Sequence, residues 1–165
     1  MSPNMSCRFG MMDPLVTARG WREALAHHLM RLEIGARLSR FFTPSPDRAI
    51  RHYVARAAPI FVVTVERGGE VCGVAEVHPH HVLPRAAEIA VSVDEDLRRR
   101  GIGRELFERA LTEARARGIG DIWVVYLSGN EAMRRIAHRA GFASVPGGDP
   151  GTITAHLIDL AEGRG

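Results

Sequence analysis

The sequence has no lysine, few cysteines and no long apolar run. Its 22 Lys+Arg residues are all arginine, which excludes a lysine nucleophile or Schiff base. Cys7 and Cys72 are too few for a disulfide framework or a thiolate metal site. No apolar run approaches the roughly 18 residues that a membrane span needs. Residues 1–10 lack the apolar segment of a secretion signal and are expected to form a disordered leader, so a cytoplasmic location is the default.

The remaining composition is that of an ordinary globular chain. Its 165 residues are 45% hydrophobic and 25% charged, enough to bury one core, and we expect a single domain over residues 11–165. The net charge is +3, but aromatics make up only 6%, and the acidic residues 94–96 offset the arginines at 98–100. These features argue against a nucleic-acid partner.

Hydrophobic periodicity predicts helices and strands in mixed order. The helical patterns cover residues 21–34, 47–56, 103–117 and 130–140. The strand patterns cover residues 60–65, 71–77, 87–93, 122–127, 142–145 and 152–160. The first two strands are joined by a hairpin turn at Gly68-Gly69. This order is typical of an α/β fold with a mixed sheet.

The most informative segment is residues 98–104, Arg-Arg-Arg-Gly-Ile-Gly-Arg, between a strand and an amphipathic helix. Glycines let the chain turn sharply, and the free N–H groups of the first helical turn favour an anion. The usual dinucleotide motif needs a third glycine where this chain has Leu106. A nucleotide P-loop needs a lysine. The segment therefore predicts a polyanion-binding site that differs from both the dinucleotide motif and the P-loop.

This segment also carries a resemblance to a known family. Arg98-x-x-Gly101-x-Gly103, after a strand and opening a long helix, resembles the acyl-CoA signature of the GNAT N-acyltransferase superfamily. Downstream, Asn130 and the helix ending at residues 141–142 resemble the next block of that family. The likeness covers about residues 60–160 and extends more loosely upstream, where Arg40-Phe41-Phe42 is similar to bacterial protein-lysine acetyltransferases.

The resemblance implies a central, mostly antiparallel sheet with splayed strands, flanked by about four helices. It implies acetyl-CoA as cosubstrate, no metal, and transfer of acetyl to a primary amine by direct attack in a ternary complex. That amine is a protein lysine or a small molecule. The residues implied to bind acyl-CoA are Val91, Ser92, Val93, Arg98, Arg99, Arg100, Gly101, Ile102, Gly103, Arg104 and Asn130. A plain N-cap role for Asn130 remains the alternative.

Catalysis needs a base for the amine, and Glu88 is the candidate. It is an acidic residue inside an apolar strand pattern, where partial burial raises a carboxyl pKa, and related enzymes place a base at this strand position. Glu76 is the second choice, and a solvated strand position is the alternative reading of Glu88. The family's proton-donating tyrosine position is Ala137 here. The CoA thiolate then leaves without a proton donor or receives its proton from another group. The candidate donors are Ser128, Tyr126 and His138.

Several alternatives stay open. The three histidines of residues 78–81 favour an exposed loop on the acceptor side over a metal site, because ligands from one loop rarely complete a coordination shell. The competing function is a non-catalytic acyl-CoA-binding or sensing module. A homodimer is compatible with the resemblance, but the sequence decides neither the oligomeric state nor the acceptor.

Overall fold

The computed structural model describes residues 6–17 and 20–158. The strands are β1 (Arg8–Met12), β2 (Phe61–Arg67), β3 (Glu70–Pro79), β4 (Ala86–Val93), β5 (Asp121–Leu127), β6 (Ala143–Val145) and β7 (Thr152–Ile158). The helices are α1 (Trp21–Arg31), α2 (Ile34–Phe41), α3 (Asp47–Arg56), α4 (Ile102–Ala116) and α5 (Glu131–Arg139), with a 3-10 turn η1 (Glu95–Leu97) before α4.

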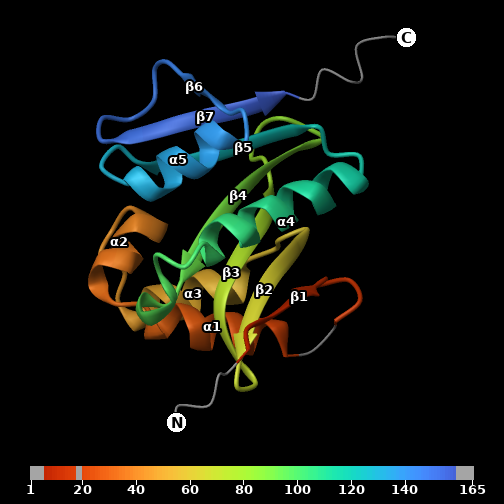
Figure 1. Ribbon diagram of the computed structural model, residues 1–165, viewed down its shortest axis with the longest axis vertical. Helices are drawn as coiled ribbons and strands as arrows, with labels where there is room; N and C mark the ends of the chain where they lie inside the picture. The colour runs from red at the N-terminus through yellow and green to blue at the C-terminus, as the bar shows by residue number, and fades with distance from the viewer. Residues whose placement is uncertain (1–5, 18–19, 159–165) are drawn as a thin grey trace.

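The strands form one sheet in the order β1-β2-β3-β4-β5-β7-β6 (Figure 1). Neighbouring strands are antiparallel except β4 and β5, which run parallel. The mixed α/β class and the mostly antiparallel sheet predicted from the sequence are confirmed. The hairpin over Gly68-Gly69 is present between β2 and β3.

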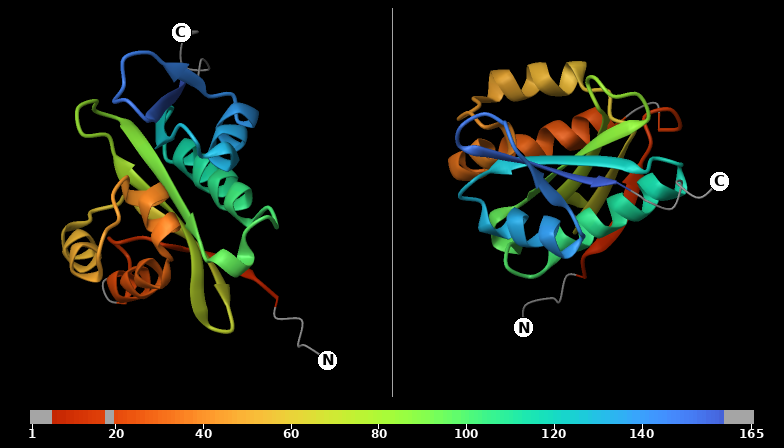
Figure 2. Two further views of the ribbon diagram at one scale, coloured as in Figure 1. Left: turned by 90° about the vertical axis from the view of Figure 1, so that its left-hand side faces the viewer. Right: turned by 90° about the horizontal axis from the view of Figure 1, so that it is seen from above.

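Helices cover both faces of the sheet (Figure 2). The apolar face of α4, with Leu106, Phe107 and Ala110, is fully buried against one side, where α5 also packs. On the other side, α1 and α3 bury a second cluster that includes Leu25 and Ile50. In the segments described, no helix is both long and apolar enough to cross a membrane.

The sheet opens between its two parallel strands. The register between β4 and β5 joins only residues 86–88 with residues 121–123. Beyond that point β4 continues to Val93 in register with β3, while β5 continues to Leu127 in register with β7. One backbone edge of each strand is therefore left without a strand partner over residues 89–93 and 124–127. This divergence positions the site described below.

Two expectations for the N-terminal part are wrong. The leader expected over residues 1–10 includes part of β1, because Arg8–Met12 pair with β2 at the edge of the sheet. Residues 1–5 lie outside the described part. The helix expected over residues 21–34 ends at Arg31, and the separate helix α2 follows it. Glu33 causes this restart, since its carboxylate accepts hydrogen bonds from the backbone N–H groups of Gly35 and Ala36.

The C-terminal strands agree closely with the expectation. The patterns over residues 142–145 and 152–160 correspond to β6 and β7, which pair with each other. Residues 159–160 of the second pattern lie outside the described part of the chain.

Candidate functional site

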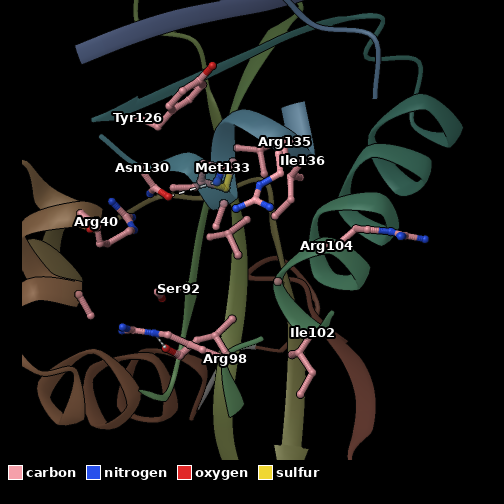
Figure 3. Close-up of a pocket in the computed structure, with 18 of the residues that line it drawn as sticks. Arg40, Ser92, Arg98, Ile102, Arg104, Tyr126, Asn130, Met133, Arg135 and Ile136 are labelled. Carbon is pink, nitrogen blue, oxygen red and sulfur yellow. Dashed lines mark hydrogen bonds between the residues drawn. The ribbon is translucent and has the colours of Figure 1, made fainter. Parts of the chain in front are cut away.

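A cavity of about 770 Å³ occupies the opening between β4 and β5 (Figure 3). Its floor is the free edge of β4, and its walls come from α2, the start of α4 and the first turns of α5. The residues that line it include every predicted acyl-CoA residue except Arg100. The structure therefore brings these residues together around one space, while their roles in binding stay predictions.

The backbone has an unusual conformation where the chain enters α4, at the Arg98 end of this cavity. Arg99 and Gly101 both have left-handed φ angles, of 61° and 76°. Gly101 forms the N-cap of α4, so the unbonded N–H groups of the first helical turn face outward there. A Cβ atom at Gly103 would lie 3.7 Å from Val93 and about 4 Å from Val91, on the cavity side of the helix. The glycines thus set the turn and keep the cavity open.

The arginines around this turn do not all act alike. Arg98 and Arg99 line the cavity, and Arg98 is held 3.3 Å from the Glu33 carboxylate at the start of α2. Arg104 lines the cavity too, but its side chain points away and pairs with Glu108 at 2.9 Å (Figure 3). Of the arginines at this turn, Arg98 and Arg99 therefore supply the positive charge on the cavity side.

The hydroxyl of Ser92 faces α1. Its Oγ lies 3.0 Å from Nε2 of the fully buried His28, whose Nδ1 lies 2.9 Å from Oδ1 of Asp94. Arg31 also pairs with Asp94 at 3.0 Å. Because the Ser92 hydroxyl is hydrogen-bonded to His28 of α1, the main chain is the part of Ser92 available to a ligand in the cavity. The buried contacts tie the end of β4 to α1 just before the arginine turn.

Asn130 both caps α5 and lines the cavity. Its Oδ1 accepts a hydrogen bond of 3.1 Å from the backbone N–H of Met133, so the capping role is real. The cap uses the oxygen and leaves the side-chain amide N–H groups available. Farther along α5, Met133, Arg135 and Ile136 also face the cavity.

Sequence reasoning missed the side chains that α2 contributes. Ala36, Ser39 and Arg40 line the cavity opposite the helices of the other face. The sequence indicates Arg40 only through a loose family resemblance. Its Nη2 lies 2.6 Å from Oε2 of the buried Glu76, a contact between positions 36 residues apart in sequence.

Arg40, Tyr53 and Glu76 form a buried polar cluster. Arg40 donates one hydrogen bond of 2.8 Å to the Tyr53 hydroxyl and one of 2.6 Å to Oε2 of Glu76. Burial alone would raise the pKa of Glu76, but the charge of Arg40, together with His78 and the Tyr53 hydrogen bond, lowers it to about 2. Because Glu76 is fully paired and ionised, it is a poor proton acceptor, which weakens the second choice for the base.

Glu88 has a different setting. It lies half-buried on β4, directly opposite His78 on β3 and Trp123 on β5. It does not line the cavity itself, although its neighbours Ile89 and Ala90 do. Within the residues described, no hydrogen bond or ion pair engages its carboxylate. A partly buried carboxylate with free lone pairs can accept a proton, and its catalytic role stays a prediction.

The family's tyrosine position gives no proton donor. Ala137 is buried in the core. Of the three candidate replacements, Ser128 and His138 are exposed and outside the cavity lining, whereas Tyr126 lines the cavity. Burial raises the pKa of Tyr126, and its hydroxyl points away from the Arg98 end (Figure 3).

The histidine loop forms an aromatic stack. The His80 ring stacks on His81 at 4.6 Å between centroids and lies 5.3 Å from Trp123, which stacks on His156 at 3.9 Å. A search over the described residues finds no cluster of three or more His, Cys, Asp or Glu side chains able to hold a metal ion. Trp123, whose ring contacts His80, is also the register partner of Glu88 on β5, so the loop lies close to Glu88.

Relatives and solved structures resemble different portions of this chain. The [Ribosomal protein bS18]-alanine N-acetyltransferase of Salmonella typhimurium is 34% identical over 83 residues. That match spans 50% of this chain and only 52% of the relative. The GNAT domain of S. lividans PAT superposes with a TM-score of 0.72 at 18% identity, covering 93% of this chain and 90% of that one.

A third likeness adds a bound ligand. The structure of yncA from Salmonella typhimurium, solved with its cofactor acetyl-CoA, superposes with a TM-score of 0.63 at 21% identity. It covers 92% of this chain and 93% of that one. At these identities the structural matches establish the fold. The model of the acetyltransferase (GNAT) family matches residues 23–142, well over half of the sequence, and the chain therefore belongs to that family.

Proposed function

We propose that this protein transfers an acetyl group from acetyl-CoA to a primary amine. The observation that carries the proposal is the cavity between the diverging β4 and β5, which opens at one end onto the glycine–arginine turn of α4. A long, narrow ligand with a polyanionic end and an acyl end fits those two features. The acetyl-CoA bound to the structural neighbour yncA has this form.

The donor would bind through backbone and charge together. The pyrophosphate would accept hydrogen bonds from the N–H groups of the first turn of α4, with Arg98 and Arg99 adding charge. The pantetheine arm would pair with the unpartnered edge of β4, through the main chain of Val91 and Val93. The side-chain amide of Asn130 would contact the same arm. Arg98 would exchange its contact with Glu33 for a phosphate.

The reaction would then proceed by direct attack. Glu88 would take a proton from the acceptor ammonium, and the free amine would attack the thioester carbonyl. A backbone N–H of the β4 edge would stabilise the developing oxyanion. When the tetrahedral intermediate collapses, the carbon–sulfur bond breaks, the nitrogen loses its second proton, and the CoA sulfur is protonated. Since Ala137 stands at the family's tyrosine position and is buried, we expect the thiolate to leave without a tyrosine donor at that position.

Thiol release from acetyl-CoA in the presence of an amine panel tests this proposal. We expect at least one amine or peptide to raise release above hydrolysis. Glu88→Gln should lower kcat by roughly 100-fold or more, as loss of a general base typically does. Glu70→Gln, at an exposed hairpin position, is the matched control and should keep the wild-type rate. A rate in Glu88→Gln equal to wild type would remove Glu88 from the mechanism.

One observation favours a second candidate, a non-catalytic acyl-CoA-binding module. Ala137 stands where the family places a proton-donating tyrosine, and it is only 2% exposed. The two functions are separated by pairing calorimetric acetyl-CoA binding with the thiol assay. Binding without amine-dependent release would support the module, whereas release with any amine excludes it.

A further inference from the structure

His78 occupies a place on β3 that the mechanism above does not use. It pairs directly with Glu88 in the antiparallel register, so the two side chains project from the same face of the sheet. In such pairs the Cβ atoms lie about 4.5–5.5 Å apart. Its side chain is 24% exposed, whereas Glu76, two residues earlier on the same face, is fully buried. His78 therefore connects the buried cluster to the surface beside Glu88.

The hydrogen bonds around His78 determine which ring nitrogen carries the proton. Its Nε2 lies 3.2 Å from Oε1 of Glu76 and 3.1 Å from the Tyr53 hydroxyl. The Tyr53 hydroxyl donates its own hydrogen to Glu76 at 2.7 Å. An ionised carboxylate only accepts hydrogen bonds, so Nε2 must be the donor. In the neutral imidazole, Nδ1 then carries a lone pair.

The buried polar cluster of Arg40, Tyr53 and Glu76 holds the His78 ring in this orientation. Arg40 neutralises Glu76 from the other side, with Nε and Nη2 at 3.2 Å and 2.6 Å from Oε2. A carboxylate bonded to one imidazole nitrogen orients the ring and sets which nitrogen carries the proton. The charged and titratable groups facing His78 are Glu76 on β3, Tyr53 on α3, Arg40 on α2 through Glu76, and Glu88 on β4.

We infer that His78 is a second proton acceptor for the acceptor amine, acting through Nδ1 alongside Glu88. This role rests on the proposed acetyl transfer and adds a residue to it. An ammonium acceptor must lose two protons in the reaction, one before attack and one from the nitrogen of the tetrahedral intermediate. Two adjacent acceptors, a carboxylate and an oriented imidazole, match that requirement.

Glu88 and His78 each remove one proton from the acceptor nitrogen in this scheme. Glu88 takes the first proton, and the amine nitrogen forms its bond to the thioester carbon. His78 Nδ1 takes the second proton from the same nitrogen as the carbon–sulfur bond breaks. One of the two protons ends on the CoA sulfur and the other reaches water, which the partly exposed His78 contacts. The products are the amide, CoA thiol and one proton.

The variant His78→Gln separates this role from a structural one. Glutamine keeps an N–H donor near the Nε2 position for Glu76 but has no titrating nitrogen. We expect kcat at saturating substrates to fall roughly 10- to 100-fold, with the KM for acetyl-CoA unchanged. At pH values low enough to protonate both groups, log kcat against pH should approach a slope of two in wild type and of one in both His78→Gln and Glu88→Gln, because each variant lacks one of two groups that must be deprotonated.

His52→Gln on the exposed surface of α3 is the matched control, and we expect wild-type rate and slope. Nitrogen-15 NMR of the imidazoles gives a readout besides activity: the neutral His78 ring should be the Nε2–H tautomer. An Nδ1–H tautomer overturns the inference. So does a folded His78→Gln variant with wild-type kcat and slope, which would leave the proposed acetyl transfer intact. If no amine supports thiol release, the proposed function fails and the role of His78 with it.

Discussion

Arg40 on α2 and Glu76 on β3 form an ion pair at 2.6 Å with almost no exposure to solvent. This pair joins the helix that walls the cavity to the strand that carries His78. Buried ion pairs are often no more stabilising than apolar substitutes, yet removing one partner is costly, because the other charge stays buried and uncompensated. We therefore expect the pair to contribute more to holding α2 against β3 than to net stability.

The first prediction follows from that asymmetry. Arg40→Met should lower the free energy of unfolding by about 3–5 kcal/mol, because it strands the Glu76 carboxylate in the core. The double variant Arg40→Met with Glu76→Leu should recover most of the loss. Urea unfolding at neutral pH measures both. A double variant as unstable as the single one would show that packing, and not stranded charge, dominates at this position.

The second prediction concerns acid. The pKa of Glu76 is lowered from 4.5 to about 2 in the folded protein, so its contribution to stability is complete above pH 4.5. That contribution is lost as the pH falls from 4.5 toward 2. The pKa of Asp94 is also lowered, opposed by burial and driven by His28 and Arg31, and it acts in the same direction.

Arg40→Met should reverse the part of this pH dependence that belongs to Glu76. Without the arginine, burial raises the pKa of Glu76, and protonation then relieves the stranded charge. The stability difference between wild type and variant should therefore narrow as the pH is lowered from 7 to 3. Urea unfolding of both proteins at matched pH values measures it. A difference that stays constant or widens over that range would contradict the assignment of the pKa shift to Arg40.

The third prediction separates the two glycines of the arginine turn. Gly101→Ala should cost about 1–2 kcal/mol of stability, since its left-handed φ of 76° disfavours any Cβ. Gly118→Ala is the matched control, because it has a φ of 77° and open space around it at the far end of α4. Both should be similarly destabilised, but only Gly101→Ala should weaken acetyl-CoA binding, as measured by calorimetry.

Gly103→Val should behave in the opposite way. A Cβ there meets Val93 at an ordinary contact distance of 3.7 Å, so the helix should stay folded. The added methyl groups would project into the cavity and block the donor. We expect a thermal midpoint close to wild type with acetyl-CoA binding lost. Retained binding in a folded Gly103→Val protein would show that the donor does not approach this face of α4.

The site divides into a part that the sequence could predict and a part that it could not. The turn at Gly101 and the cap at Asn130 depend on local chemistry, in which a positive φ or a capping oxygen acts within a few residues. Arg40 and Glu76 are 36 positions apart, and only the tertiary packing of α2 on the sheet brings them together. No periodicity in either segment indicates that contact.

The same distinction between local and long-range contacts explains where the predicted fold differs from the structure. The sequence pattern predicts one helix over residues 21–34, because apolar residues continue at helical spacing through Ile34, and it does not predict α2. In the structure α1 ends at Arg31, and the carboxylate of Glu33 caps the new helix that begins at Ile34. Strand β1 is a short edge strand of five residues whose pattern is weak. Its pairing with β2, from Arg8 opposite Glu66 onward, is a long-range contact that composition does not encode.

The last prediction distinguishes the two roles of Asn130. Asn130→Ala should lower stability by about 1 kcal/mol, because the N–H of Met133 loses its cap. Asn130→Asp keeps the capping oxygen and should retain stability, but it removes the side-chain N–H donors that the cap leaves available. If those donors contact pantetheine, loss of one neutral hydrogen bond of about 1 kcal/mol weakens acetyl-CoA binding roughly fivefold in both variants. We expect that pattern in paired urea-unfolding and calorimetric titrations. Wild-type affinity in Asn130→Asp would restrict Asn130 to capping α5.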